Sequence, residues 1–239
     1  MSIKSIFTDN FSDFGENIAK NQIDQSMEKL QTDFELTNYK SYFAVDNIYV
    51  FKKLSILLFP FQNKEWARKL SVNDQGENIY YLPKEDKNAF DLYIPIMAFV
   101  TYILLSAIKT GLSGPTFTPE FLLKTTSSSL IAFSIELVLL KIFLHISKSD
   151  LSVIDAISMA GYKFVAVNTT ILFYLVTGHI GYYLAWVYST AALVFYMKNA
   201  YANGFSENKK GSVGHNSKVA GFGIAELILQ SLLILYYGI

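Results

Sequence analysis

The feature that most constrains this chain is a series of long apolar runs in its C-terminal part. A hydrocarbon core about 30 Å thick requires roughly 17–25 mostly apolar helical residues for one crossing. Five runs meet that length, namely 92–108, 125–146, 156–177, 180–197 and 219–239. Because lipid offers no partners to unpaired backbone groups, these runs predict an all-α fold, a polytopic membrane protein with a bundle of five transmembrane helices.

The charged residues divide the chain into regions of different character. Residues 1–91 hold 11 Lys and Arg against 14 Asp and Glu, whereas residues 92–239 hold 9 against 6. A polar, acidic segment therefore precedes the apolar one. We predict a partly disordered cytosolic tail over 1–41, a cytosolic juxtamembrane amphipathic region over 42–91, and the five-span bundle over 92–239.

The orientation of the bundle follows from its flanking charges. The first fifteen residues show no cleavable signal peptide, so we expect the N-terminus in the cytosol. Five crossings then place the C-terminus in the lumen. The connection 198–218 carries Lys198, Lys209, Lys210 and Lys218 against Glu207, which agrees with the rule that cytosolic loops are rich in Lys and Arg.

Several classes of chemistry lack the residues that they need. The chain has no cysteine, which excludes disulfides, thiolate zinc sites and cysteine nucleophiles. It has 3 histidines. The histidines are scattered, and no glycine-rich loop ends in a phosphate-binding Lys-Ser or Lys-Thr. We therefore expect no enzymatic activity, no cofactor and no nucleic-acid partner.

Ionisable groups inside the predicted spans are costly unless they are paired or hydrated. Lys163 lies near the end of its span, from which its side chain can extend to water. Glu136 and Glu226 lie deeper, with Gln230 one helical turn after Glu226. These four residues predict either intramembrane polar contacts between helices or, alternatively, an ion path in a small transporter or channel.

The stretch 42–69 contains an apolar run, 54–61, that is too short to span a membrane. Read as a helix from Ile48, its apolar residues recur at spacings of three and four. Three interpretations remain open: an amphipathic helix on the cytosolic leaflet, a buried helix packed on the bundle, and a surface for a partner protein.

Three segments stand out, namely YFAVDNIYVFKKLSILLFPFQNKEWAR (42–68), LPKEDKNAFDLYIPIMAFVTYILL (82–105) and SVIDAISMAGYKFVAV (152–167). Together they resemble the Yif family, the Yip-interacting factors of the early secretory pathway. In the third segment an acidic residue precedes a Gly-Tyr-Lys triplet. The second segment is the most specific, because its charged run and the following Asp-Leu-Tyr-Ile-Pro are hard to meet by chance.

The resemblance implies a non-enzymatic factor in ER-to-Golgi vesicle transport. Its expected location is Golgi and endoplasmic reticulum membranes and transport vesicles. It implies a heteromer with a Yip-family membrane protein, Rab-type GTPases as ligands, and vesicle coat components and membrane lipids as further contacts. The partner-binding residues that it implies are Tyr49, Lys53, Leu54, Phe59, Pro60, Phe61, Trp66, Asp91, Tyr93 and Pro95.

Two rival functions come from other classes of protein. A transporter or channel would use Glu136 and Glu226, and would show pH-dependent flux that changes when either is replaced by glutamine. A lipid-acting protein, such as a scramblase or curvature sensor, would be active as the purified protein without any partner.

Overall fold

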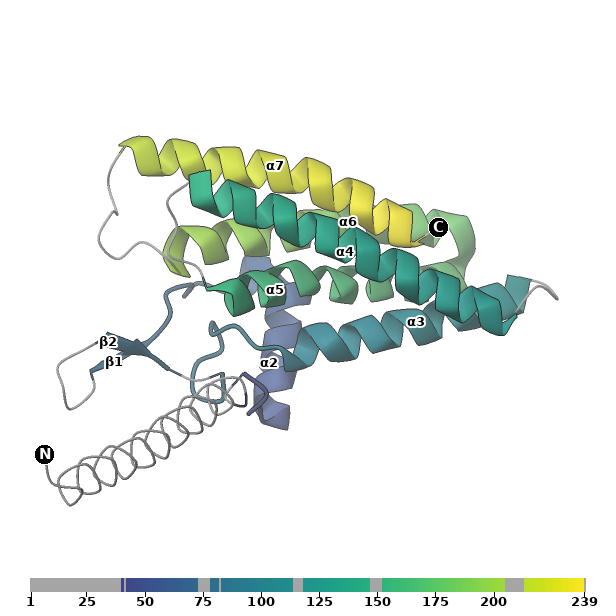
Figure 1. Ribbon diagram of the computed structural model, residues 1–239, viewed down its shortest axis with the longest axis horizontal. Helices are drawn as coiled ribbons and strands as arrows, with labels where there is room; N and C mark the ends of the chain where they lie inside the picture. Colours follow the sequence, from purple (N-terminus) through teal and green to yellow (C-terminus); the bar gives the residue numbers. More distant parts are fainter. Residues whose placement is uncertain are drawn as a thin grey trace, which may run out of the picture. The chain divides into compact units, whose positions relative to one another are not determined.

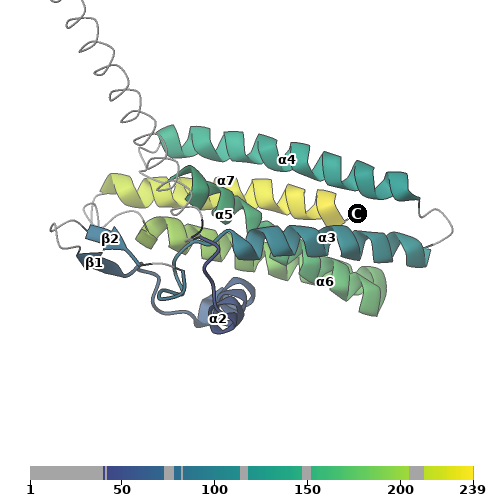
Figure 2. The ribbon, with the colours of Figure 1, turned by 60° about the horizontal axis from the view of Figure 1, so that its bottom comes forward.

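The helices α3, α4, α6 and α7 run alongside one another, and α2 lies across them (Figures 1 and 2). The computed structural model describes residues 40, 42–72, 78–81, 83–113, 118–146, 152–204 and 213–238, so the predicted tail 1–41 lies almost entirely outside the described residues. The elements are α2 (Asn47–Leu58), the 3₁₀ helix η1 (Pro60–Gln62), β1 (Leu70–Val72), β2 (Asn78–Tyr80), α3 (Tyr93–Ser113), α4 (Pro119–Ile146), α5 (Val153–Gly161), α6 (Lys163–Gly204) and α7 (Val213–Gly238).

Helix α6 reverses its direction at Gly178. The φ of 71° and ψ of −151° at this residue are not helical, and a residue with a Cβ adopts them only with strain. The first arm of α6 (163–177) and the second arm (179–204) return alongside each other, since the rings of Tyr162 and Tyr196 lie 5.7 Å apart at the far ends. The bend lies between the predicted runs 156–177 and 180–197.

Contacts between distant residues fix the order of the helices in the bundle. The side chain of Asn168 on the first arm of α6 donates to the carbonyl of Ala98 on α3 (2.9 Å). The indole of Trp186 on the second arm donates to the carbonyl of Ser231 on α7 (3.1 Å). The hydroxyl of Tyr237 links α7 to α4 through the carbonyl of Ser129. Each of these polar groups would be costly to leave unpaired in an apolar interior, so the bonds define how the helices pair.

Three segments of the described chain are long and apolar enough to cross a membrane, Tyr93–Leu112, Pro119–His145 and Val153–Ala202. The third has 50 residues and contains the bend at Gly178. Helix α7 contributes a shorter apolar stretch, Ile228–Tyr237. The predicted helical, polytopic membrane bundle agrees with these segments, whereas the count of five crossings and the side of the N-terminus stay predictions.

Two short strands depart from the all-α prediction. Strands β1 and β2 form an antiparallel pair in which Leu70, Ser71 and Val72 face Tyr80, Ile79 and Asn78. Each strand has three residues, which is too short for an alternating apolar pattern to be recognised in the sequence.

Asp46 is the N-cap residue before α2, and its carboxylate accepts from the backbone N–H of Asn47 (2.8 Å). Its buried residues are Tyr49, Lys53, Ile56 and Leu57. They recur at helical spacing and so form one face, and this face packs on α6. Of the interpretations left open for 42–69, a helix packed on the bundle is the one that this contact supports directly.

Candidate functional site

The junction of α2 with the bundle contains a buried polar cluster, called here the Lys53 centre, made of Tyr49, Lys53, Asp91 and Tyr162 with the rings of Phe90 and Tyr196. Asp91 caps the start of α3, because its Oδ1 accepts from the backbone N–H of Ile94 (2.7 Å). Its Oδ2 accepts from the hydroxyls of Tyr49 (3.0 Å) and Tyr162 (2.8 Å). One carboxylate thus connects α2, α3 and the joint between α5 and α6.

Lys53 is fully buried beside this carboxylate. Its Nζ donates to the carbonyls of Ala89 (2.8 Å) and Lys87 (3.2 Å). The rings of Phe90, Tyr162 and Tyr196 surround it at 5.6, 5.3 and 5.4 Å from Nζ to the ring centroids. A cation so close to aromatic faces gains from their quadrupoles, and more strongly where water is excluded. Lys53 therefore anchors α2 to the bundle.

Burial lowers the pKa of Lys53 to about 8, although the negative charge of Asp91 opposes this shift. Below pH 8 the ammonium is charged in both the folded and unfolded states, and its desolvation reduces stability. Between pH 8 and the ordinary lysine pKa of 10.5, the unfolded state binds the proton and the folded state does not. The contribution of Lys53 to the free energy of unfolding therefore rises with pH between pH 8 and pH 10.5.

We expect the free energy of unfolding to rise by about 2–3 kcal/mol between pH 8 and pH 10 through Lys53. Replacing Lys53 by methionine should remove this rise, because methionine has no proton to lose. The measurement is denaturant unfolding of the purified protein in detergent at several pH values. If the free energy of unfolding rose equally with pH in the variant and in the parent protein, the rise would not come from Lys53.

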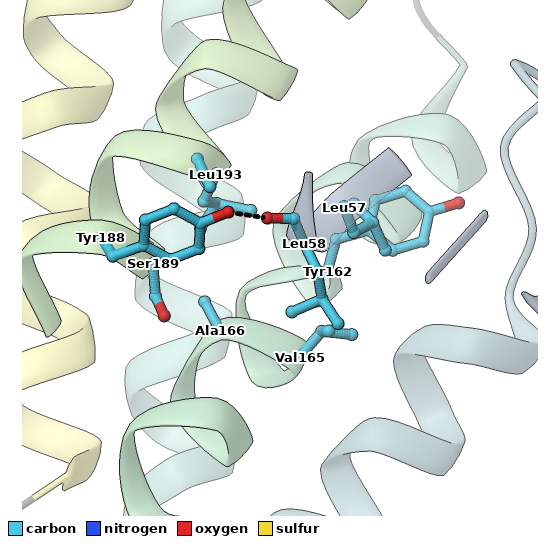
Figure 3. Close-up of a pocket in the computed structure, with 9 residues that line it drawn as sticks. Leu57, Leu58, Tyr162, Val165, Ala166, Tyr188, Ser189 and Leu193 are labelled. Carbon is cyan, nitrogen blue, oxygen red and sulfur yellow. Dashed lines mark hydrogen bonds between the residues drawn. The ribbon is translucent and has the colours of Figure 1, made fainter. Parts of the chain in front are cut away.

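Beyond the C-terminal end of α2, the chain follows the second arm of α6 and contacts it through aromatic side chains. Ring centroids are 6.2 Å apart for Phe59 and Tyr188 and 4.8 Å for Phe61 and Phe195. Figure 3 shows the hydroxyl of Tyr188 donating to the carbonyl of Leu58 at 2.8 Å, beside a cavity of about 10 Å³. Trp66 packs on the rings of Phe195 and Tyr196.

The residues predicted to bind a partner therefore fall into two groups. Tyr49, Lys53, Pro60, Asp91 and Pro95 are buried within the chain's own fold, and Leu54 and Trp66 are half-buried. Phe59, Phe61 and Tyr93 are exposed. The first group positions α2 and α3, and only the exposed group is open to another molecule.

A second buried cluster, the Glu136 centre, consists of Glu136, Lys163 and Gln230. Lys163 forms an ion pair with Oε2 of Glu136, while Nε2 of Gln230 donates to Oε1 (2.8 Å). All three side chains are buried. The rings of Phe133, Phe164 and Tyr237 lie 4.9, 5.2 and 5.0 Å from the Lys163 Nζ. The cluster joins α4, α6 and α7.

The structure corrects one expectation for these residues and does not reach another. Lys163 does not extend to water, because the carboxylate of Glu136 on the neighbouring helix lies within its reach. Glu226 lies in α7, and the structure does not describe its side chain.

The Gly-Tyr-Lys triplet 161–163 connects both clusters. A Cβ on Gly161 would lie 2.6 Å from the Cβ of Pro95, so glycine permits the close approach of α5 to α3. Tyr162 bonds Asp91, and Lys163 pairs with Glu136. The sequence marked this triplet as a motif, but nothing in the sequence pointed to Tyr196, whose ring completes the Lys53 centre from the second arm of α6.

A groove of about 480 Å³ runs between the second arm of α6 and α7. Its lining is mostly apolar and comprises Trp186, Val187, Thr190, Ala191, Ile228, Ser231 and Leu232. The Thr190 hydroxyl is buried and has no hydrogen-bond partner within the part of the chain that the structure describes. A buried hydroxyl without a partner costs free energy, so a group supplied from outside would be favoured here.

Comparison with known proteins identifies a family. The family model described as YIF1 matches residues 8–237. Among curated proteins, "Protein YIF1A" of Danio rerio is 35% identical over 186 residues, covering 77% of this chain and 59% of the relative. "Protein YIF1B" of Homo sapiens is 33% identical, covering 77% and 57%.

A fungal relative carries a name that states its role. "Protein transport protein yif1" of Schizosaccharomyces pombe is 33% identical over 197 residues, covering 78% of this chain and 64% of the relative. The chain thus spans about three fifths of the length of the curated relatives that it matches. No solved structure matches the chain.

Proposed function

The chain belongs to the YIF1 family, and from that membership we propose that it is a non-enzymatic factor in vesicle transport between the endoplasmic reticulum and the Golgi. The observation that carries this proposal is the family match over residues 8–237, together with relatives named as protein transport proteins. The apolar helices support a place in the membranes of the secretory pathway.

The proposed mechanism is scaffolding. The bundle crosses the membrane five times with its N-terminus in the cytosol, pairs with a Yip-type membrane subunit, and recruits Rab-type GTPases or coat components on its cytosolic side. The two buried clusters fit this role, because the Lys53 centre holds α2 against the bundle and the Glu136 centre joins α4, α6 and α7.

The groove between α6 and α7 is the surface that we propose for the membrane partner. An apolar helix seated there would cover the half-buried Trp186 and bring a polar atom to Thr190. Small residues such as Ala191 let helices approach closely, and close packing drives association within lipid. The occupant that we propose is one transmembrane helix of the partner subunit.

The first test is affinity purification of the tagged full-length protein from its own cells in mild detergent, followed by mass spectrometry. We expect a stoichiometric multispanning partner, with smaller amounts of GTPase or coat subunits. In cells that lack the protein, secreted cargo should accumulate in the endoplasmic reticulum. Recovery of the protein alone, together with normal cargo transit, would contradict the proposal.

Filling the groove provides a sharper test of the pairing surface. Ala191→Leu is expected to reduce recovery of the membrane partner at least tenfold, because the larger side chain occupies the space of the incoming helix. The control is Ser134→Leu on the exposed face of α4, which adds similar bulk away from the groove. Equal partner recovery with both variants, at equal amounts of folded protein, would place the partner elsewhere.

A further inference from the structure

The outward face of α2 carries large apolar side chains that the bundle leaves uncovered. Ile48 and Phe51 are 63% and 78% exposed, and the adjoining Phe59 and Phe61 are 49% and 54% exposed. On α2, Ile48 and Phe51 lie away from the buried Lys53. Exposed apolar side chains gathered on the short segment 48–61 mark a surface that contacts something other than water.

The position of α2 along the bundle indicates what that surface meets. Helix α2 contacts the second arm of α6 at Tyr196 through Lys53 and at Tyr188 through Leu58. These tyrosines are eight residues apart, about 12 Å along a helix, and both belong to the segment Val153–Ala202 that is apolar enough to cross a membrane. Helix α2 therefore lies beside the apolar part of the bundle rather than beyond its end.

The surface of α2 is also continuous with the outer surface of α6. The ring of Phe61 packs at a tilt against Phe195 and that of Phe59 against Tyr188, and both α6 residues remain exposed on the outside of the bundle. A single apolar surface thus extends from the candidate membrane span onto α2. Figure 2 shows α2 nearly end-on beside helices that run along the page, so its axis crosses theirs.

The two flanks of α2 differ in polarity. At 3.6 residues per turn, Val50, Leu54 and Leu58 lie to one side of Phe51, whereas Lys52 and Ser55 lie to the other, together with the exposed Ile48. A helix in the plane of a membrane presents its apolar flank to the acyl chains and its polar flank to the headgroups and water. The flanks of α2 match that environment.

We propose that α2 is an in-plane membrane helix, seated in the leaflet on the side where α3 begins, with Phe51 and the exposed Phe59 and Phe61 in contact with lipid acyl chains. The Lys53 centre fixes its depth, because it ties α2 to Asp91, just before the candidate span Tyr93–Leu112, and to Tyr162 at the joint between α5 and α6. A partner protein is not needed to cover this face.

The chain has no cysteine, so single-cysteine variants give a clean background for the test. The full-length purified protein is reconstituted in phosphatidylcholine and phosphatidylserine liposomes and carries a spin label at Phe51→Cys or at Lys52→Cys. These neighbouring positions on α2 are both exposed, so either label should leave the fold intact. Leu184→Cys on α6 is the lipid-facing reference, and Lys64→Cys is the water-facing reference.

Collision rates with lipid-soluble oxygen and with a water-soluble nickel complex then report the surroundings of each label. We expect the oxygen-to-nickel ratio at Phe51 to approach that at Leu184 and to exceed the ratio at Lys52 severalfold. The ratio at Lys52 should approach that at Lys64.

A ratio at Phe51 equal to that at Lys64 would overturn the proposal. The label at Phe51→Cys could instead be shielded from the nickel complex only in the protein complex isolated from cells, and not in the purified chain. That result would overturn the proposal too, and would assign the face to a protein partner. Because the liposomes hold the purified chain alone, the result does not depend on whether the proposed transport function is correct.

Discussion

Replacing Glu136 by leucine is expected to destabilise the bundle by about 3–5 kcal/mol, because it removes the anionic partner of a buried lysine. The carboxylate also accepts from Gln230, so the substitution removes a link between α4 and α7 as well as the ion pair with α6. The measurement is unfolding of the purified protein in detergent, with circular dichroism as the signal.

The double variant Glu136→Leu with Lys163→Met separates this loss of pairing from a loss of packing. Neither charge remains in the double variant, so we expect it to be more stable than the single Glu136→Leu variant. Lys124→Met, at an exposed position of the same helix, is the control and should change the unfolding free energy little. If Glu136→Leu alone were as stable as Lys124→Met, the Glu136 centre would not be what holds the helices together.

Replacing Asp91 by alanine is expected to release α2 from the bundle. The substitution removes the cap of α3 and the acceptor for the hydroxyls of Tyr49 and Tyr162. Hydrogen bonds to a charged group contribute about 1.5–3 kcal/mol each and a cap about 1 kcal/mol, so a loss of about 3–5 kcal/mol is expected after allowance for non-additivity.

Hydrogen exchange measured by mass spectrometry is the suitable readout for Asp91→Ala. Amides of residues 47–58 should exchange about a hundredfold faster or more, since each 1.4 kcal/mol corresponds to a factor of ten. Asp91→Asn keeps an oxygen for the cap and should have a smaller effect, while Glu85→Ala, exposed in the same loop, should have none. Unchanged exchange of α2 in Asp91→Ala would mean that packing alone keeps it in place.

The sequence predicts the helical bundle well because lipid restricts the possible structures severely. A span must be helical, apolar and of a certain length, and all three properties can be read from 92–108 or 125–146 without knowing the neighbours. Gly178 could be recognised as a turn because it separates two such runs. The strands β1 and β2 could not, since three residues carry no periodic signal.

The sequence predicts the buried clusters less completely, because their geometry depends on long-range contacts. Glu136 and Lys163 stand out as charges among apolar residues, but their pairing depends on how α4 packs on α6. Lys53 looks like a surface residue within the amphipathic pattern. Its burial follows from Phe90 and Tyr196, which lie far from it in sequence and carry no sign of a shared site.

The distance in sequence between α2 and its partners has a consequence for biosynthesis. Leu58 and Tyr188 are separated by 130 residues, so a ribosome needs roughly ten seconds to deliver the second residue after the first. During that interval α2 has been made but the arm of α6 that receives it has not. Helix α2 therefore reaches its place against the bundle only after both arms of α6 have been synthesised.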